Sequence, residues 1–113
     1  MNERDSDSLA DMLTFASDAI ELLGERDAAA LRADMRTRYA LIRAVELVGE
    51  AATRVSSGTR DQLSGVPWRE VIGMRNILVH GYDGINLNVV VNVVLDHMPA
   101  LIAEIRRVLG QDP

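Results

Sequence analysis

The sequence predicts an all-α protein, an antiparallel bundle of four to five helices in a single domain, residues 1–113. Three observations favour this class. Apolar residues recur at spacings of three and four along most of the chain, which is the repeat of a helix with one buried face. Residues that commonly cap helices precede these segments, and short polar stretches separate them. With 48% hydrophobic residues, the chain is also long enough to bury one core.

The first predicted helix carries one apolar stripe. Its members are Leu9, Met12, Leu13, Ala16, Ile20 and Leu23. We expect Ser6 or Ser8 to cap the start of this helix and Gly24 to end it. Asp27 is then expected to open a short helix over the sequence AAALRA.

Asp34 is expected to cap a long second helix that runs to about residue 55. The apolar face of this helix is predicted to consist of Met35, Tyr39, Ile42, Val45, Val48, Ala52 and Val55. Because Tyr39 lies in this stripe, we expect its role to be structural.

The stretch SSGTRDQLSGVP is rich in Ser and Gly and is predicted to be a loop. Pro67 suits the first turn of a third helix, where its missing N–H costs nothing. This helix should run through WREVIGMRNILVH and stop at Gly81, with Trp68 anchoring the core beside the loop. The sequence GYDG that follows is predicted to be a turn.

Asn86 can cap a last helix over the sequence LNVVVNVVLDHMPALIAEIRRVL. Its β-branched run VVVNVV would suit a strand by propensity alone. One helical face nevertheless continues through Val90, Val93, Val94, His97, Leu101, Ile105 and Val108. Pro99 inside this helix predicts a bend, and His97 on the apolar stripe is expected to be packed and hydrogen-bonded.

Composition argues against several classes of site. The chain has no cysteine and two histidines, so we expect no disulfide, no thiolate ligand and no dedicated metal site. No apolar run approaches the roughly 18 residues of a membrane span, and the beginning MNERDSDSLADM does not resemble a signal peptide. The sequence therefore predicts a soluble, cytoplasmic protein without a membrane partner.

The net charge of −5 and the pI of about 4.9 argue against broad electrostatic binding of nucleic acid. All twelve basic residues are arginines, which together with the abundance of Ala and Val suggests a genome-wide composition bias. The number of arginines is therefore uninformative, and only their individual positions carry a functional signal.

The sequence MRNILVHGY, residues 74–82, holds the main candidate site. Asn76 and His80 are four residues apart and share a helical face. Arg75 precedes His80 by five residues, which places the two about 140° apart around an ideal helix. They meet only if the helix end distorts, if Arg75 reaches around, or if a second chain completes the site. From spacing alone, the favoured interpretation is a cation at a helix C-terminus.

Glu46 and Glu50 share a face of the second helix and are flanked by Arg43 and Arg54. One interpretation is a solvated face with ion pairs along the helix. The other is an acidic pair that orients the arginine or the histidine of the candidate site. Glu50 lies in the sequence GEAA, whose small residues suggest close packing, and a carboxylate there needs a partner.

The stretch IGMRNILVHGYDGIN resembles the signature of the HepT-like toxins, a branch of the HEPN domain superfamily. That signature is Arg, four residues, His, one residue and Tyr, matched here by Arg75, His80 and Tyr82, with Asn76 directly after the arginine. RYALIRAVELVGEAATRVS, VPWREVIGMRN and HMPALIAEI also resemble family segments, so the likeness covers nearly the whole chain. Two departures, Leu31 for an aromatic residue and Val91 for a tryptophan, fall at expected packing positions.

This resemblance implies a HEPN-like bundle that forms a homodimer and acts as a metal-independent endoribonuclease without a cofactor. It also implies the toxin of a type VII-like toxin–antitoxin pair, whose antitoxin is a minimal nucleotidyltransferase that transfers AMP to the motif tyrosine, here Tyr82. HEPN-like domains also serve as non-catalytic nucleotide-binding or scaffold modules. The alternative is therefore a non-catalytic partner of a nucleotidyltransferase.

The residue types suit cleavage of RNA through its own 2′-OH. A histidine with a pKa near ~6.5 can transfer protons at neutral pH, and an arginine can hold phosphoryl oxygens. The reaction needs both a base and an acid, whereas one chain offers one motif histidine. We therefore expect a composite site in which both chains of a dimer contribute Arg75, Asn76 and His80, with Asn76 orienting His80. RNA binding would rely on a local basic cleft, for which Arg69 and Arg43 are candidates.

Overall fold

The computed structural model describes residues 1–80 and 86–110 and, of residues 76–80, the helical backbone alone. Its helices are α1 (Glu3–Leu23), α2 (Ala28–Ala33), α3 (Met35–Thr53), α4 (Ser57–Gln62), α5 (Trp68–His80), α6 (Leu87–Asp96) and α7 (Met98–Leu109). These described ranges contain no strand, so the predicted all-α class is confirmed. The helices outnumber the expected four to five because the predicted loop contains α4 and the predicted last helix is divided into α6 and α7.

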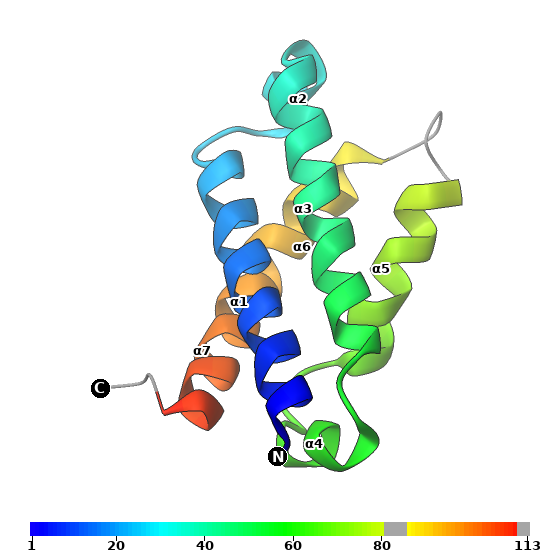
Figure 1. Cartoon of the computed structure of the whole chain (residues 1–113). Helices are drawn as coiled ribbons and strands as arrows, with labels where there is room; N and C mark the ends of the chain where they lie inside the picture. Colours follow the sequence, from blue (N-terminus) through cyan, green and yellow to red (C-terminus); the bar gives the residue numbers. More distant parts are fainter. Residues whose placement is uncertain (81–85, 111–113) are drawn as a thin grey trace.

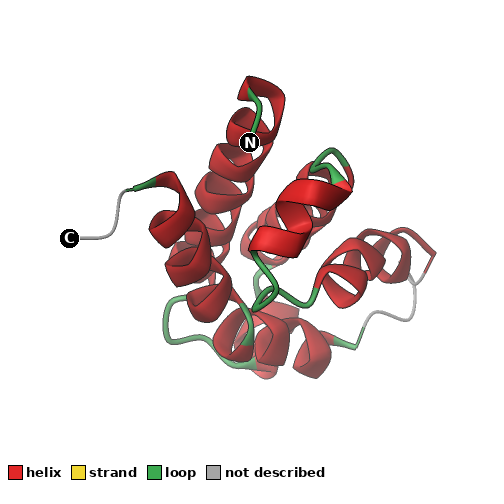
Figure 2. Ribbon diagram, turned by 90° about the horizontal axis from the view of Figure 1, so that it is seen from below, coloured by secondary structure: helices red, strands yellow, loops and turns green. Residues whose placement is uncertain are grey.

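Three helices, α1, α3 and α5, lie side by side and alternate in direction (Figure 1). α3 is central to this row because it packs against α1 on one side and α5 on the other. α7 and α6 pack against α1, and α6 also contacts α2. Seen from below, the described chain is helical apart from short connections (Figure 2). The shortest principal extent is 19 Å, about two helix diameters.

The core lies between α1, α3 and the helices that pack against them. Its largest fully buried side chains are Leu9, Met12, Leu23, Leu31, Leu41, Leu63, Met98, Leu101, Ile105, Val45, Val48 and Val71. Leu31 is fully buried, and Val91 is half-buried against the core. Both were expected to be packing positions, and the structure confirms this.

The bounds of α1 are set by local hydrogen bonds at each end. Asn2 caps the helix, because its Oδ1 accepts the Asp5 N–H at 2.7 Å. The prediction of Ser6 or Ser8 as the cap is wrong, since both lie inside the helix and Ser8 is buried. Gly24 ends α1 as predicted, with a φ of 55° that favours glycine.

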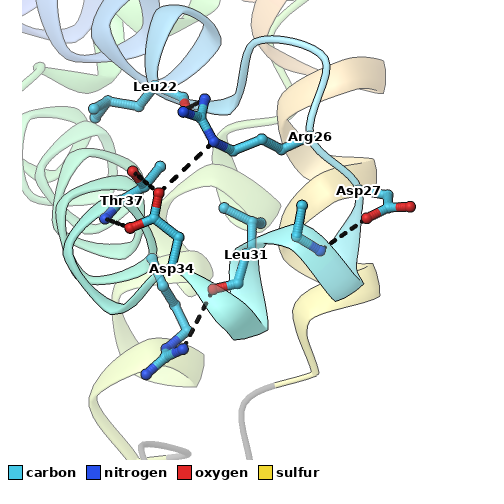
Figure 3. Close-up of polar contacts among 8 residues, drawn as sticks. Leu22, Arg26, Asp27, Leu31, Asp34 and Thr37 are labelled. Atoms are coloured by element: carbon cyan, nitrogen blue, oxygen red, sulfur yellow. Dashed lines mark hydrogen bonds and ion pairs between the residues drawn. The ribbon is translucent and has the colours of Figure 1, made fainter.

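The caps predicted for α2 and α3 are confirmed. Asp27 Oδ1 accepts the Ala30 N–H at 2.9 Å, and Asp34 Oδ1 accepts the Thr37 N–H at 3.1 Å. The close-up of this corner shows both caps (Figure 3). The hydrogen bonds from Thr37 also hold the pKa of the Asp34 carboxyl below its ordinary value.

The predicted apolar face of α3 is wrong over its first turns. Met35 and Tyr39 are 56% and 48% exposed, whereas Ile42 and all later predicted members are buried. At 100° per residue, Tyr39 points about 120° away from Val45, the centre of the buried face. Spacings of three and four drift around the helix over this length, and the expected stripe therefore leaves the core.

The predicted loop before the third helix contains α4, whose beginning is fixed by a residue of α1. The Asp5 carboxylate is 2% exposed and accepts the Ser56 N–H at 3.0 Å and the Ser56 hydroxyl at 2.5 Å. It also accepts the Thr59 hydroxyl at 2.6 Å. These bonds lower the pKa of Asp5 to about 2 because they stabilise its charged form. Asp5 thus joins the start of α1 to the segment that leads into α5.

α5 begins at Trp68, one residue after the proline expected in its first turn. Trp68 is half-buried beside the core, as predicted. Its Nε1–H donates to the Leu63 carbonyl at 3.1 Å, and the Arg60 guanidinium lies 5.7 Å from its ring centre. These contacts fix the base of the helix that carries the candidate site.

The last predicted helix is two helices that meet at His97, with Pro99 in the first turn of α7. The prediction of one bent helix is wrong, because the break lies where a proline ring opposes continuation of the preceding helix. His97 is exposed, so its prediction as a packed residue is also wrong. Asn86 caps α6 as predicted, accepting N–H groups from Asn88 and Val89 at 3.0 and 3.4 Å.

Residues Leu87–Leu109 are long and apolar enough to cross a membrane by length and composition alone. This corrects the expectation that no apolar run has that length. In the structure, the stretch is interrupted at His97, and buried side chains from both parts, including Val94 and Leu101, belong to the core cluster. Part of its apolar character is therefore used in packing the bundle, with 33% of its most apolar window buried.

Candidate functional site

The motif lies at the C-terminal end of α5, the helix that packs against α3. Val71 and Met74 are buried on the inner face of α5, so the helix is held by the core up to the residue before Arg75. Arg75 itself is half-buried, with 37% of its side chain exposed. The apolar residues of α5 thus place Arg75 at the edge of the α3–α5 contact.

A close approach of the two helices fixes this position further. A Cβ atom at Gly49 of α3 would lie 3.0 Å from the Val71 carbonyl oxygen and 3.3 Å from the Arg75 Cβ. Those distances are shorter than ordinary van der Waals contact, so only glycine allows α3 to approach α5 in this way. The small residues around Glu50 suggested close packing, and the structure shows that Gly49 provides it.

Arg75 makes one described ion pair, with Glu50 of α3. The Arg75 Nη1 to Glu50 Oε1 distance is 3.4 Å, and the two side chains are 37% and 43% exposed. The Nε–H of Arg75 is buried and has no hydrogen-bond partner in the described part of the chain. A long, solvent-exposed pair of this kind is weak, and the guanidinium retains donors that a phosphate can use.

The predicted acidic pair does not act together on the motif. Glu46 forms an ion pair with Arg43 within α3, at a spacing of three residues. Only Glu50 contacts Arg75. The two interpretations of the acidic face therefore each apply to one residue: Glu46 belongs to a surface ion pair, and Glu50 reaches the candidate site.

The remaining motif residues are placed only in part. Asn76 and His80 lie on the α5 backbone, and their side chains fall outside the described residues. Tyr82 and the predicted GYDG turn also fall outside them. α5 is helical through His80, so the predicted relation of Arg75 to His80 stays a prediction from ideal helix spacing.

Three further features concern the possible ligands of the protein and the surroundings of the motif. Among the side chains that the structure describes, those of residues 1–75 and 86–110, no group of three or more His, Cys, Asp or Glu could hold a metal ion. A groove elsewhere, between α1 and α3, is lined by Phe15, Asp18, Glu21, Leu22, Arg26, Thr37, Ala40, Arg43, Ala44 and Leu47. Arg69, expected beside the motif, is exposed near the start of α5, about 9 Å along the helix axis from Arg75.

The model of the family described as Ribonuclease HepT-like matches residues 12–108. The chain belongs to the HepT-like ribonuclease family. The resemblance seen in the motif and its flanks is confirmed, and so is the expected class of enzyme, a ribonuclease.

Curated relatives agree with this family. A Methanocaldococcus jannaschii protein whose name assigns it provisionally as an RNase is 36% identical over 106 residues, 93% of this chain and 97% of the relative. A Thermococcus cleftensis protein, named by inference as the ribonuclease HepT, is 35% identical over 68 residues, 60% and 62% of the two chains. A Caldanaerobacter subterraneus protein, provisionally an RNase, is 33% identical over 73 residues, 65% of each chain. No solved structure matches this chain significantly.

Proposed function

We propose that this HepT-like ribonuclease is the toxin of a two-component toxin–antitoxin system and a metal-independent endoribonuclease of the cytoplasm. The observation that supports this most is the complete motif, in which Arg75, Asn76 and His80 belong to α5 and Tyr82 follows in the sequence. Arg75 is partly exposed and has one long described ion pair. A helix end that only needed capping would not require this full set.

The proposed reaction uses the 2′-OH of RNA as the nucleophile. A base removes the hydroxyl proton, the 2′ oxygen attacks the adjacent phosphorus, and the bond to the 5′ oxygen breaks. An acid gives a proton to that leaving oxygen, and the products are a 2′,3′-cyclic phosphate and a 5′-hydroxyl. His80 would supply the proton transfers, Asn76 would orient it, and Arg75 would hold the phosphoryl oxygens.

The composite site requires a homodimer. Base and acid roles need two histidines, and a two-fold axis would bring His80 and Arg75 of both chains to one cleft. Five residues span about 140° on an ideal helix, and in a dimer Arg75 and His80 of the same chain need not meet. Glu50 would orient Arg75 from α3, as its contact at 3.4 Å suggests.

Neutralisation would follow from transfer of AMP to Tyr82 by a minimal nucleotidyltransferase antitoxin. The tyrosine hydroxyl would attack the α-phosphorus of ATP, form a phosphodiester and release pyrophosphate. The added negative charge would compete for Arg75, and the adenosine would hinder RNA at the site. This proposal rests on the family signature, in which Tyr82 follows His80 by two residues.

Cleavage by purified variants tests the catalytic proposal. His80→Ala and Arg75→Ala should each lower the rate of RNA cleavage, for His80 by about 10²–10⁴-fold, the usual effect of losing a general acid or base. His97→Ala is the matched control, because His97 is an exposed histidine at the junction of α6 and α7, away from α5. Activity should persist in EDTA and disappear on RNA with a 2′-deoxy group at the cleaved bond. If His80→Ala cleaves as fast as His97→Ala, the alternative of a non-catalytic scaffold is favoured.

Two further measurements test the assembly and the modification. A mixture of His80→Ala and Arg75→Ala chains should recover part of the lost activity, whereas a fully active monomer contradicts the composite site. Co-expression with the cognate nucleotidyltransferase should increase the mass of the chain by adenylyl units, and Tyr82→Phe should prevent this and remain toxic. A neutralised complex with unmodified Tyr82 would mean that the antitoxin blocks the site by binding alone.

A further inference from the structure

Basic charge is concentrated in one segment of this acidic protein. The segment from Arg32 to Arg43, with both ends included, has four arginines and a single acidic residue, Asp34, whereas the whole chain has a net charge of −5. Asp34 is occupied in capping α3, and the Arg26 guanidinium lies 3.9 Å from its carboxylate. This segment therefore presents positive charge that the total composition conceals.

Three of its residues form an exposed stripe on α3, here named the α3 ridge: Arg36, Tyr39 and Arg43. They follow one another at spacings of three and four, so they share one face. Arg36 is exposed, the Tyr39 residue is 48% exposed, and the Arg43 side chain is 62% exposed. The ridge is thus an aromatic ring between two accessible guanidinium groups.

Arg38 holds the tyrosine from one side. Its Nη1 donates to the carbonyl oxygens of Leu31 and Arg32, at 3.3 and 2.6 Å, and the first of these bonds is drawn in Figure 3. The Arg38 guanidinium carbon lies 5.3 Å from the centre of the Tyr39 ring, a cation–π distance. Because Arg38 is fixed by the end of α2, the ring has a defined support.

The ridge begins at the level of the motif. α3 and α5 run in opposite directions (Figure 1), and Gly49 packs against Arg75. Along α5, the backbone of His80 lies five residues, about 7.5 Å, beyond Arg75. Because α3 runs in the opposite direction, the same distance on α3 leads from Gly49 back to the turn that contains Arg43. From there the ridge continues about 10 Å to Arg36.

We propose that the α3 ridge is a binding track for single-stranded RNA that extends from the bond to be cleaved. Arg36 and Arg43 bind successive phosphates, and a base stacks at Tyr39, a combination common in proteins that hold single strands. Arg43 forms an ion pair with Glu46, so RNA binding replaces this ion pair by a contact between Arg43 and a phosphate. Arg43 also lines the groove between α1 and α3, where Asp18 and Glu21 oppose a phosphate, so the track follows the outer face of α3 and does not enter that groove.

This inference rests on the proposed function, and its test separates binding from cleavage. Binding of an RNA of roughly twelve nucleotides, within the usual range of single-strand sites, is measured by fluorescence anisotropy in the His80→Ala background. Tyr39→Ala should weaken binding by about tenfold, and Tyr39→Phe should retain it. Arg36→Ala and Arg43→Ala should each reduce the slope of log affinity against log salt by about 0.7. Arg106→Ala on α7 is the control and should change neither quantity.

Cleavage then compares this oligonucleotide with a dinucleotide that is too short to reach the ridge. Ridge variants should lose about tenfold in kcat/KM on the oligonucleotide and stay within about twofold of the wild type on the dinucleotide. Unchanged oligonucleotide binding and an unchanged salt slope would overturn the track. Equal losses on both substrates would also overturn it, as would a change in molar mass by light scattering, which would make the ridge a contact between copies. Wild-type protein that binds RNA through the ridge without cleaving it would refute the proposed function alone.

Discussion

Replacing Gly49 of α3 by alanine and replacing Gly73 of α5 by alanine should have opposite effects on stability, although the two helices are in contact. A Cβ at Gly49 would meet the Val71 carbonyl at 3.0 Å and the Arg75 Cβ at 3.3 Å. Neither atom can move alone, because both belong to or adjoin the α5 backbone. A Cβ at Gly73, on α5 itself, would have no described atom within 4 Å beyond its own helix. Gly49→Ala should therefore push α3 and α5 apart by a few tenths of an ångström, whereas Gly73→Ala should leave them in place.

The magnitudes follow from two opposing effects. Replacing a helical glycine by alanine stabilises a helix by about 1 kcal/mol. Inserting a methyl group into a packed contact costs about 1–3 kcal/mol. Gly73→Ala has only the first effect and should raise the unfolding free energy by about 1 kcal/mol. Gly49→Ala has both and should lower it by about 1 kcal/mol. For a chain of this length, each change corresponds to a shift of about 4 °C in Tm.

Thermal unfolding followed by circular dichroism measures both shifts in one buffer. RNA cleavage provides a second measurement, because displacing Arg75 should lower the rate, and a misplacement of about 1 Å can cost about 10²-fold. Gly73→Ala should retain the wild-type rate. If Gly49→Ala raises Tm as much as Gly73→Ala does, the close approach of α3 and α5 at Arg75 is absent and this reasoning is refuted.

Three other perturbations follow from the described contacts. The bonds at the start of α4 lower the pKa of Asp5 from 3.8 to about 2, so its stabilising effect is complete above pH 3.8 and is lost as pH falls towards 2. Urea unfolding at several pH values should show this loss in the wild type and a smaller one in Asp5→Asn. Glu50→Gln removes an exposed pair worth about 0–1 kcal/mol, so Tm should change little, and a lower cleavage rate would indicate that Glu50 orients Arg75. Leu31→Ala should cost about 2–5 kcal/mol in chemical unfolding, because Leu31 is fully buried, and a cost below about 1 kcal/mol would contradict its burial.

The sequence by itself determined the helical class, several helix ends and the candidate motif. Asp27, Asp34 and Asn86 cap their helices through side chains that bond N–H groups two or three residues ahead. Such contacts depend on local geometry alone, so spacing in the sequence is sufficient to predict them. The order of Arg75, Asn76 and His80 along α5 is local in the same way. Their catalytic roles stay predictions.

Only the tertiary structure decided which side chains meet across the bundle. Asp5 binds the start of α4 from 51 residues away, and a residue so distant in sequence leaves no periodic signal. Glu46 and Glu50 look alike on one face of α3, yet only Glu50 contacts Arg75. Tyr39 continues an apolar stripe in the sequence but is exposed, because that stripe drifts around the helix and leaves the face that the neighbouring helices cover. Periodicity gives a helix its faces, whereas the packing of other helices against it determines which face is covered.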